Sequence, residues 1–184
     1  MKKIALLLLM AITVTLAGCG GDDPISEEEL KTNELRNKYN DKIVGSWWQE
    51  RQNESVKLFE QLTFASDGSL TGYVKKQTRH KVIVGGQEVW TDWETTSGNG
   101  DLKGNWSLLW KDGKSYLNLY ATINNDEDFS HSEVWYGQDI PFNDIFTDEN
   151  NDTWLDIESP YWKGKDNERL IYYIYQKGTS SPTF

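Results

Sequence analysis

The sequence predicts an all-β fold, and three observations indicate it. Short runs of aromatic and β-branched residues alternate with polar residues from Ile43 onward. Turn-forming pairs such as Asp67-Gly68 and Asp112-Gly113 separate these runs and favour β-hairpins. The chain is also rich in aromatic residues, with 9 Trp and 9 Tyr but only 4 Pro. Sequential hairpins at this spacing predict a meander that closes into a barrel or folds as a sandwich.

The N-terminal segment has the pattern of a secretory signal peptide. Lys2 and Lys3 precede an apolar run from Ile4 to Leu16, and small residues follow it. This run is too short to cross a bilayer, which needs about 20 apolar residues. We therefore expect residues 1–18 to be a signal that is removed on export.

The stretch Leu16-Ala17-Gly18-Cys19 resembles the lipobox of bacterial lipoproteins. The resemblance implies cleavage before Cys19, a diacylglyceryl thioether on its thiol and an acyl chain on its new amino group. Two or more chains hold a protein stably on a membrane where one does not. We therefore expect a lipid-anchored outer-membrane protein; the alternative is a plain secreted protein. Because no second cysteine follows, no disulfide can form.

Residues 19–42 are predicted to form a tether and a short helix. Gly20 to Pro24 is an acidic lead, which indicates either an export signal towards the cell surface or a solvated linker in the periplasm. Ser26-Glu27-Glu28-Glu29 fits a capping box, with Ile25 and Leu30 placed as a hydrophobic staple. A helix is therefore expected from about Glu27 to Tyr39. Its apolar residues form no single stripe, which favours a place at the end or edge of the domain.

Residues 43–184 are predicted to form the β domain. The expected strands are Val44 to Glu50, Val56 to Ala65, Ser69 to Lys76, Gln87 to Thr95, Gly104 to Trp110, Tyr116 to Ile123, His131 to Gly137, Thr153 to Ile157 and Arg169 to Tyr175.

Alternation assigns faces to two of these strands. Leu117, Leu119, Ala121 and Ile123 share a core face, whereas Tyr116 and Tyr120 lie on the other face. On the strand from Val56, the apolar face also carries Glu60. Glu60 is therefore either a ligand-facing group or a residue that a bulge turns outward, and the bulge is favoured.

Gly45-Ser46-Trp47, preceded by a short helix, resembles the Gly-x-Trp signature of lipocalins. The motifs Leu62-Thr63-Phe64, Asp67-Gly68 and Gly104-Asn105-Trp106 are similar to the lipocalin-like domains of small bacterial lipoproteins. The resemblance covers roughly residues 43–176. It implies an up-and-down antiparallel barrel of 8 to 9 strands, in which Trp47 packs across the closed end against a cation from the last strand, here Arg169. Another β-sandwich or barrel is the alternative.

No catalytic constellation or cofactor motif is recognisable. His80 and His131 are the only histidines, and neither lies in a nucleophile, metal or phosphate-binding motif. The acidic run Asp148 to Asp152 lacks the Gly and Glu of an EF-hand, so a solvated hairpin loop is expected. Loss of Lys2 and Lys3 changes the net charge from −10 to −12, which argues against nucleic acid as a partner. Nothing in the sequence indicates a basic patch for a membrane surface. We expect no enzyme activity, no metal and no cofactor.

Two functions remain open, and both use aromatic residues. The first is a binding module that holds a small apolar or amphipathic ligand in an aromatic-lined barrel, as the lipocalin resemblance implies. Its candidate wall residues are Trp106, Leu108, Trp110, Tyr116, Tyr120 and Glu60. The second is an exposed platform for a glycan or protein at the cell surface, with Trp90, Trp135 and Trp162 as candidates.

Overall fold

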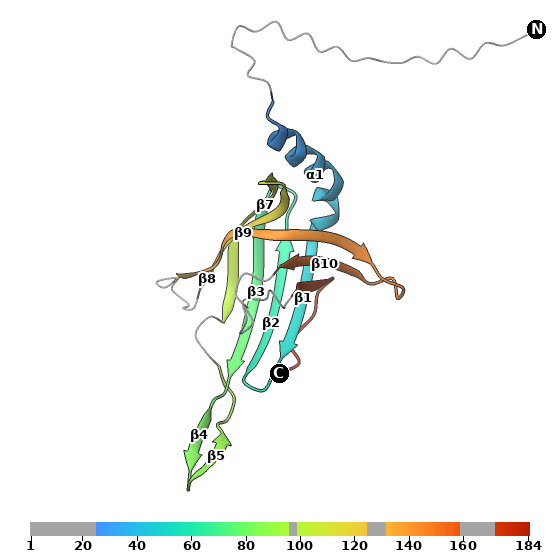
Figure 1. The fold of residues 1–184 in the computed structure, drawn as a ribbon. Coiled ribbons are helices and arrows are strands. Elements are labelled where there is room, and N and C mark those ends of the chain that lie inside the picture. The colour runs from blue at the N-terminus through green and yellow to red at the C-terminus, as the bar shows by residue number, and fades with distance from the viewer. Residues whose placement is uncertain (1–24, 96–98, 125–131, 159–171) are drawn as a thin grey trace, which may run out of the picture.

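The computed structural model describes residues 25–95, 99–124, 132–158 and 172–184; the side chains of 124, 132–138 and 172–174 are outside this description. One helix precedes the strands of a barrel (Figure 1). The elements are α1 (Glu27–Ile43), β1 (Gly45–Gln52), β2 (Val56–Phe64), β3 (Ser69–Thr78), β4 (Lys81–Val84), β5 (Gln87–Trp90), β6 (Glu94–Thr95), β7 (Gly100–Lys111), β8 (Lys114–Asn124), β9 (Ser132–Thr147), β10 (Thr153–Glu158) and β11 (Tyr172–Lys177).

Eight of these strands form a closed antiparallel barrel. Their order is β2-β1-β11-β10-β9-β8-β7-β3, and pairing of β2 with β3 closes the ring. Chain neighbours are also sheet neighbours, apart from the insertion of β4 to β6 between β3 and β7. The fold class predicted from the sequence, an up-and-down barrel preceded by a helix, is thus confirmed. The short strand β6 pairs only with the far end of β3, and β4 pairs with β5 in a separate two-stranded hairpin.

Helix α1 covers one end of the barrel, which we call the helix end. It begins where predicted, because the Ser26 side chain accepts a hydrogen bond from the Glu29 backbone N–H. It continues four residues beyond the expected end and buries Thr32, Leu35, Tyr39 and Ile43. These four positions recur every three or four residues, so they do share one face. The sequence pattern concealed this buried face, because Leu30 is apolar but lies outside the face and is exposed.

Polar contacts fix the helix to the barrel rim. Thr32 bonds the backbone of Trp110 in β7, and Arg36 Nε donates to the Leu108 carbonyl at 2.9 Å. Tyr39 donates to an Asp144 carboxylate oxygen at 2.6 Å. Burial and this carboxylate raise the pKa of Tyr39 above its ordinary value. These contacts join the helix to β7 and β9 of the barrel.

Trp47 lies at the junction of the helix and the barrel. Its ring is fully buried, and its Nε1 donates to the Ile43 carbonyl at 2.6 Å. The Lys177 ammonium, at the end of β11, lies 5.2 Å from the ring centroid and donates to the Lys42 carbonyl. Arg169, which the resemblance offered as the partner of Trp47, lies outside the described residues. The cation over the Trp47 ring is the ammonium group of Lys177, which is the last residue of β11.

Two parts of the sheet differ from the sequence prediction. Strand β9 runs from Ser132 to Thr147, far beyond the expected end at Gly137. Its register shifts opposite Ala121 in β8 and opposite Asp156 in β10, so two irregularities bend this long strand around the barrel. The hairpin β4–β5 begins six residues before the single strand that was expected there. Its turn is Gly85-Gly86, and both glycines have positive φ.

The expected signal peptide and Cys19 lie outside the described residues. Within the described ranges, we find no helix with the length and hydropathy needed to cross a bilayer.

Candidate functional site

The barrel lumen is packed at the helix end and less buried towards the other end. On β2, Phe64 and Leu62 are at most 1% exposed, Leu58 is 8% exposed and Val56 is half-buried. The same trend follows β1, from buried Trp47 to half-buried Arg51. Apolar side chains therefore fill the lumen at the helix end. The inward-facing residues of β1 to β3 become accessible at the opposite end, which we call the open end.

A buried polar cluster lies between these two parts of the lumen. It consists of Gln49 on β1, Glu60 on β2 and Tyr175 on β11, which are 4%, 2% and 0% exposed. Gln49 and Glu60 are directly opposite each other in the β1–β2 register, and Gln49 Nε2 donates to Glu60 Oε2. The Tyr175 hydroxyl donates to the same carboxylate oxygen at 3.1 Å. We call these three residues the polar trio.

The position of Glu60 decides between the two interpretations of its place in an apolar row. The pairing of β2 with both neighbours continues without a shift from Val56 to Phe64, so no bulge turns Glu60 outward. The favoured interpretation was wrong, and the carboxylate points into the lumen beside Leu58 and Leu62. Burial of a carboxylate among apolar side chains is costly unless hydrogen bonds compensate it.

One atom of the polar trio has no hydrogen-bond partner. Gln49 Oε1 is buried and is the one such side-chain atom in the described part of the chain. The amide orientation follows from chemistry, because only the NH₂ group can donate to the Glu60 carboxylate. Most buried polar atoms are satisfied, so an exception calls for an explanation. An acceptor oriented this way can receive a hydrogen bond from a ligand.

The other candidate wall residues do not line one surface. Trp106 and Leu108 face inward and are 7% and 0% exposed. Tyr116 and Tyr120 lie on the outer face of β8, where Tyr120 is 50% exposed. Trp110 is half-buried, and its backbone bonds Thr32 of the helix. The predicted aromatic wall is therefore wrong as a single site, because the strand alternation separates its members between two faces.

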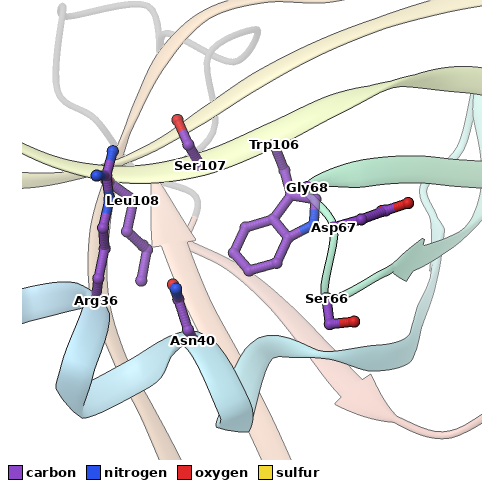
Figure 2. A pocket seen from close by; sticks show the side chains of 8 residues that line it. All are labelled: Arg36, Asn40, Ser66, Asp67, Gly68, Trp106, Ser107 and Leu108. Atoms are coloured by element: carbon purple, nitrogen blue, oxygen red, sulfur yellow. The ribbon is translucent and has the colours of Figure 1, made fainter.

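Trp106 and Leu108 instead border a cavity at the helix end. Figure 2 shows this cavity between α1, the β2–β3 turn and β7. Its volume is about 250 Å³, slightly below the range of about 300–1,000 Å³ of most ligand pockets. Its lining residues are Arg36, Asn40, Ser66, Asp67, Gly68, Trp106, Ser107 and Leu108. Trp106 packs edge-to-face on Phe64 and donates from Nε1 to the Ala65 carbonyl at 2.9 Å, so its ring is fixed.

The two charged residues around this cavity already have structural hydrogen bonds. The Asp67 carboxylate accepts from the Ser69 backbone N–H at 2.9 Å, and bonds to Ser69 lower the pKa of Asp67. Arg36 is bound to the Leu108 carbonyl through Nε. The cavity is therefore a weaker candidate than the polar trio, which contains an unsatisfied acceptor.

The acidic run after β9 is a structural turn. Asp148 accepts bonds from the backbone N–H groups of Asn150 and Asp152 and from Trp154 Nε1, at 2.9 to 3.0 Å. The bond from Trp154 is the main cause that lowers the pKa of Asp148. Residue 151 has a φ of 66°, which asparagine tolerates. The side-chain oxygens of Asp148 are thus used within the turn.

The remaining candidates divide between described and undescribed parts. His80 is exposed at the root of the β4–β5 hairpin, whereas His131 lies outside the described residues. In the described ranges, His, Cys, Asp and Glu form no group of three or more that could hold a metal ion. Of the three platform tryptophans, Trp90 is half-buried between cations; Trp162 and the side chain of Trp135 lie outside the description.

Comparisons with known proteins give no relative. No family model, no curated protein and no solved structure matches the chain. The functional argument therefore depends on the site itself.

Proposed function

We propose that this protein is a lipid-anchored component of the bacterial outer membrane that binds a small amphipathic molecule in its barrel lumen, without catalysis. The observation that supports the proposal is the polar trio, a set of buried hydrogen-bonding groups between apolar residues of the lumen, with an unpartnered acceptor at Gln49 Oε1. The increasing exposure of inward-facing residues towards the open end gives a route for a ligand.

The chemistry of the trio defines the polar part of this ligand. Gln49 Oε1 and the Glu60 carboxylate are acceptors, so a matching head group donates hydrogen bonds, as an amine or a hydroxyl does. The neighbouring Leu58 and Val56 offer apolar surface to the rest of the molecule. A ligand with an apolar chain and an amine or hydroxyl head satisfies both parts of the site. A carboxylate head would instead place two acceptors against each other.

Two fluorescent probes of equal chain length test this prediction. One is a dansylated alkyl chain with a terminal amine, and the other carries a terminal carboxylate. The protein used begins at Gly20, because every described contact lies within residues 25–184. We expect the amine probe to bind more tightly. Glu60→Gln removes one charge-assisted bond of about 1.5–3 kcal/mol and should weaken binding roughly 10- to 100-fold.

A control variant distinguishes binding at the polar trio from binding in the cavity at the helix end. Asn40→Ala changes the cavity at the helix end and leaves the polar trio intact. We expect it to bind the amine probe as the parent does. If Asn40→Ala loses binding and Glu60→Gln retains it, the probe binds in the cavity at the helix end and not at the polar trio. If neither probe binds the natively purified protein, the lumen is not a binding site and the proposal fails.

A further inference from the structure

The β4–β5 hairpin extends away from the barrel at the open end (Figure 1). Its apolar side chains are exposed: Ile83 by 77%, Val84 by 62% and Val89 by 40%. The register places Val82 opposite Val89 on one face of the ribbon, which Val84 shares, whereas Ile83 lies on the other face. Apolar side chains therefore point to both sides of the hairpin near its turn. A protein groove would cover one face, whereas a lipid layer surrounds an inserted tip.

The base of the hairpin carries a row of alternating cations and aromatic rings. The Arg79 guanidinium lies between Trp90 and Trp93, at 4.7 and 4.5 Å from their ring centroids. The Lys81 ammonium lies over the Trp90 ring at one end of the row. At the other end, the Lys57 ammonium lies 4.6 Å from the centroid of the Trp93 ring. We call this set of five residues the cation–aromatic row. Phe184 extends it, with Lys57 and Lys75 both over its ring.

Backbone contacts hold this row in place. Arg79 donates from its backbone N–H to the Ser55 carbonyl and from Nε to the Glu54 carbonyl, at 3.0 and 2.6 Å. His80 and Thr91 exchange two hydrogen bonds across the base of the hairpin. Lys81 also forms an exposed ion pair with Glu88. The sequence did not reveal this basic surface, because its cations come from β2, the residue after β3 and the hairpin.

We propose that the hairpin and the cation–aromatic row form a docking surface for a lipid bilayer that contains anionic lipids. Aliphatic residues at a tip, followed by Trp and then by Lys or Arg, match the successive layers of a membrane from acyl chains to head groups. The protein has a net charge of −10, so the rest of its surface would repel anionic lipids. The cations of the row provide local charge complementarity to such lipids.

A glycan is a poorer match to this surface. Sugar rings stack on open aromatic faces, but cations already lie over the Trp90 and Trp93 rings. A glycan would also leave Ile83 and Val84 without a role. The hairpin and α1 lie at opposite ends of the barrel (Figure 1). The contact is therefore separate from any anchor at Cys19, which precedes α1.

Vesicle flotation tests this docking surface. The chain from Gly20 onward, which carries no acyl group, is mixed with phosphatidylcholine vesicles with and without phosphatidylglycerol. We expect it to float with the vesicles that contain phosphatidylglycerol and to be released by salt. Ile83→Ser with Val84→Ser should reduce the partition on the order of tenfold or more.

A matched control removes two exposed apolar side chains at the opposite end. Ile25 and Leu30 are 58% and 49% exposed, so Ile25→Ser with Leu30→Ser should float as the parent does. Equal flotation of the two double variants, or no flotation of the parent with either vesicle, would overturn the proposal. So would a concentration-dependent dimer that only the Ile83→Ser, Val84→Ser variant loses, because the hairpin would then bind a second copy. None of these three results depends on ligand binding in the lumen.

Discussion

If ligand binding is the reason for the polar trio, the fold itself should not need it. Glu60→Leu alone removes the acceptor of two buried donors, Gln49 Nε2 and the Tyr175 hydroxyl. The triple change Gln49→Leu, Glu60→Leu and Tyr175→Phe removes the three polar groups together and nearly conserves side-chain volume. We expect the single variant to be less stable than the triple variant.

The magnitudes follow from burial. Each stranded donor costs about 1–3 kcal/mol, so two cost about 2–6 kcal/mol. Burial of a leucine side chain at residue 60, which is 2% exposed, returns about 1.5–3 kcal/mol. The expected net loss for Glu60→Leu is therefore about 2 kcal/mol. Replacement of a whole buried ionic group by apolar residues is often neutral or stabilising by about 1–4 kcal/mol, so the triple variant should equal or exceed the parent.

Urea unfolding of the parent, single and triple variants, followed by tryptophan fluorescence, measures these differences. Equal m-values would show that the same surface unfolds in each protein. The triple variant should also lose the amine probe while it keeps its stability. A triple variant that is less stable than Glu60→Leu would refute the reasoning, since the trio would then be a structural requirement of the barrel.

Two further predictions concern the helix end of the barrel. The pKa of the Tyr39 hydroxyl is raised in the folded protein, so with rising pH this hydroxyl ionises first in the unfolded chain. The neutral hydroxyl therefore stabilises the fold fully below about pH 10, and this stabilisation is lost as the pH rises towards the folded-state pKa. Urea midpoints between about pH 9 and 11 should fall more steeply for the parent than for Tyr39→Phe; parallel slopes would contradict this. At the junction, Lys177→Met should cost about 0.5–1 kcal/mol, because this exposed cation contributes mainly through the Trp47 ring. Trp47→Phe should cost clearly more, on the order of 3 kcal/mol, since it leaves a void in the core and removes the bond to Ile43. Equal losses in the same urea assay would show that Trp47 packing stabilises the barrel no more than the cation over its ring does.

Local chemistry made much of the fold predictable. Ser26 has the side chain of an N-cap, and the helix begins after it. Asp67-Gly68 and Asp112-Gly113 form the turns of the β2–β3 and β7–β8 hairpins, where Gly68, Asp112 and Gly113 have positive φ. These features depend on residues close in sequence, so the sequence alone reveals them. Alternation then assigned the core face of β8 correctly, because that strand is regular from Leu117 to Ile123.

Features that depend on irregular backbone were less predictable. Strand β9 continues through Pro141, although proline is usually confined to strand ends, edges and bulges. Its two register shifts change which residues face the lumen. For Glu60 the opposite error occurred, because a charge in an apolar row suggested a bulge where the strand is regular. The sequence shows such a residue but does not show whether the backbone or the lumen adapts to it.

The sequence offered Glu60 as a candidate, but the complete polar trio was unpredictable for a topological reason. This reason also indicates how the site is maintained. Gln49 and Glu60 come from one hairpin, but Tyr175 lies 115 residues from Glu60 and reaches it only because β11 pairs with β1. The described register of that pairing joins Trp47 to Lys177 and Trp48 to Gln176, directly beside Tyr175. Lys177 also lies over the Trp47 ring and bonds the Lys42 carbonyl. The contact between Lys177 and Trp47 thus strengthens the strand pairing that completes the polar trio, which links the helix end of the barrel to the geometry of the proposed ligand site.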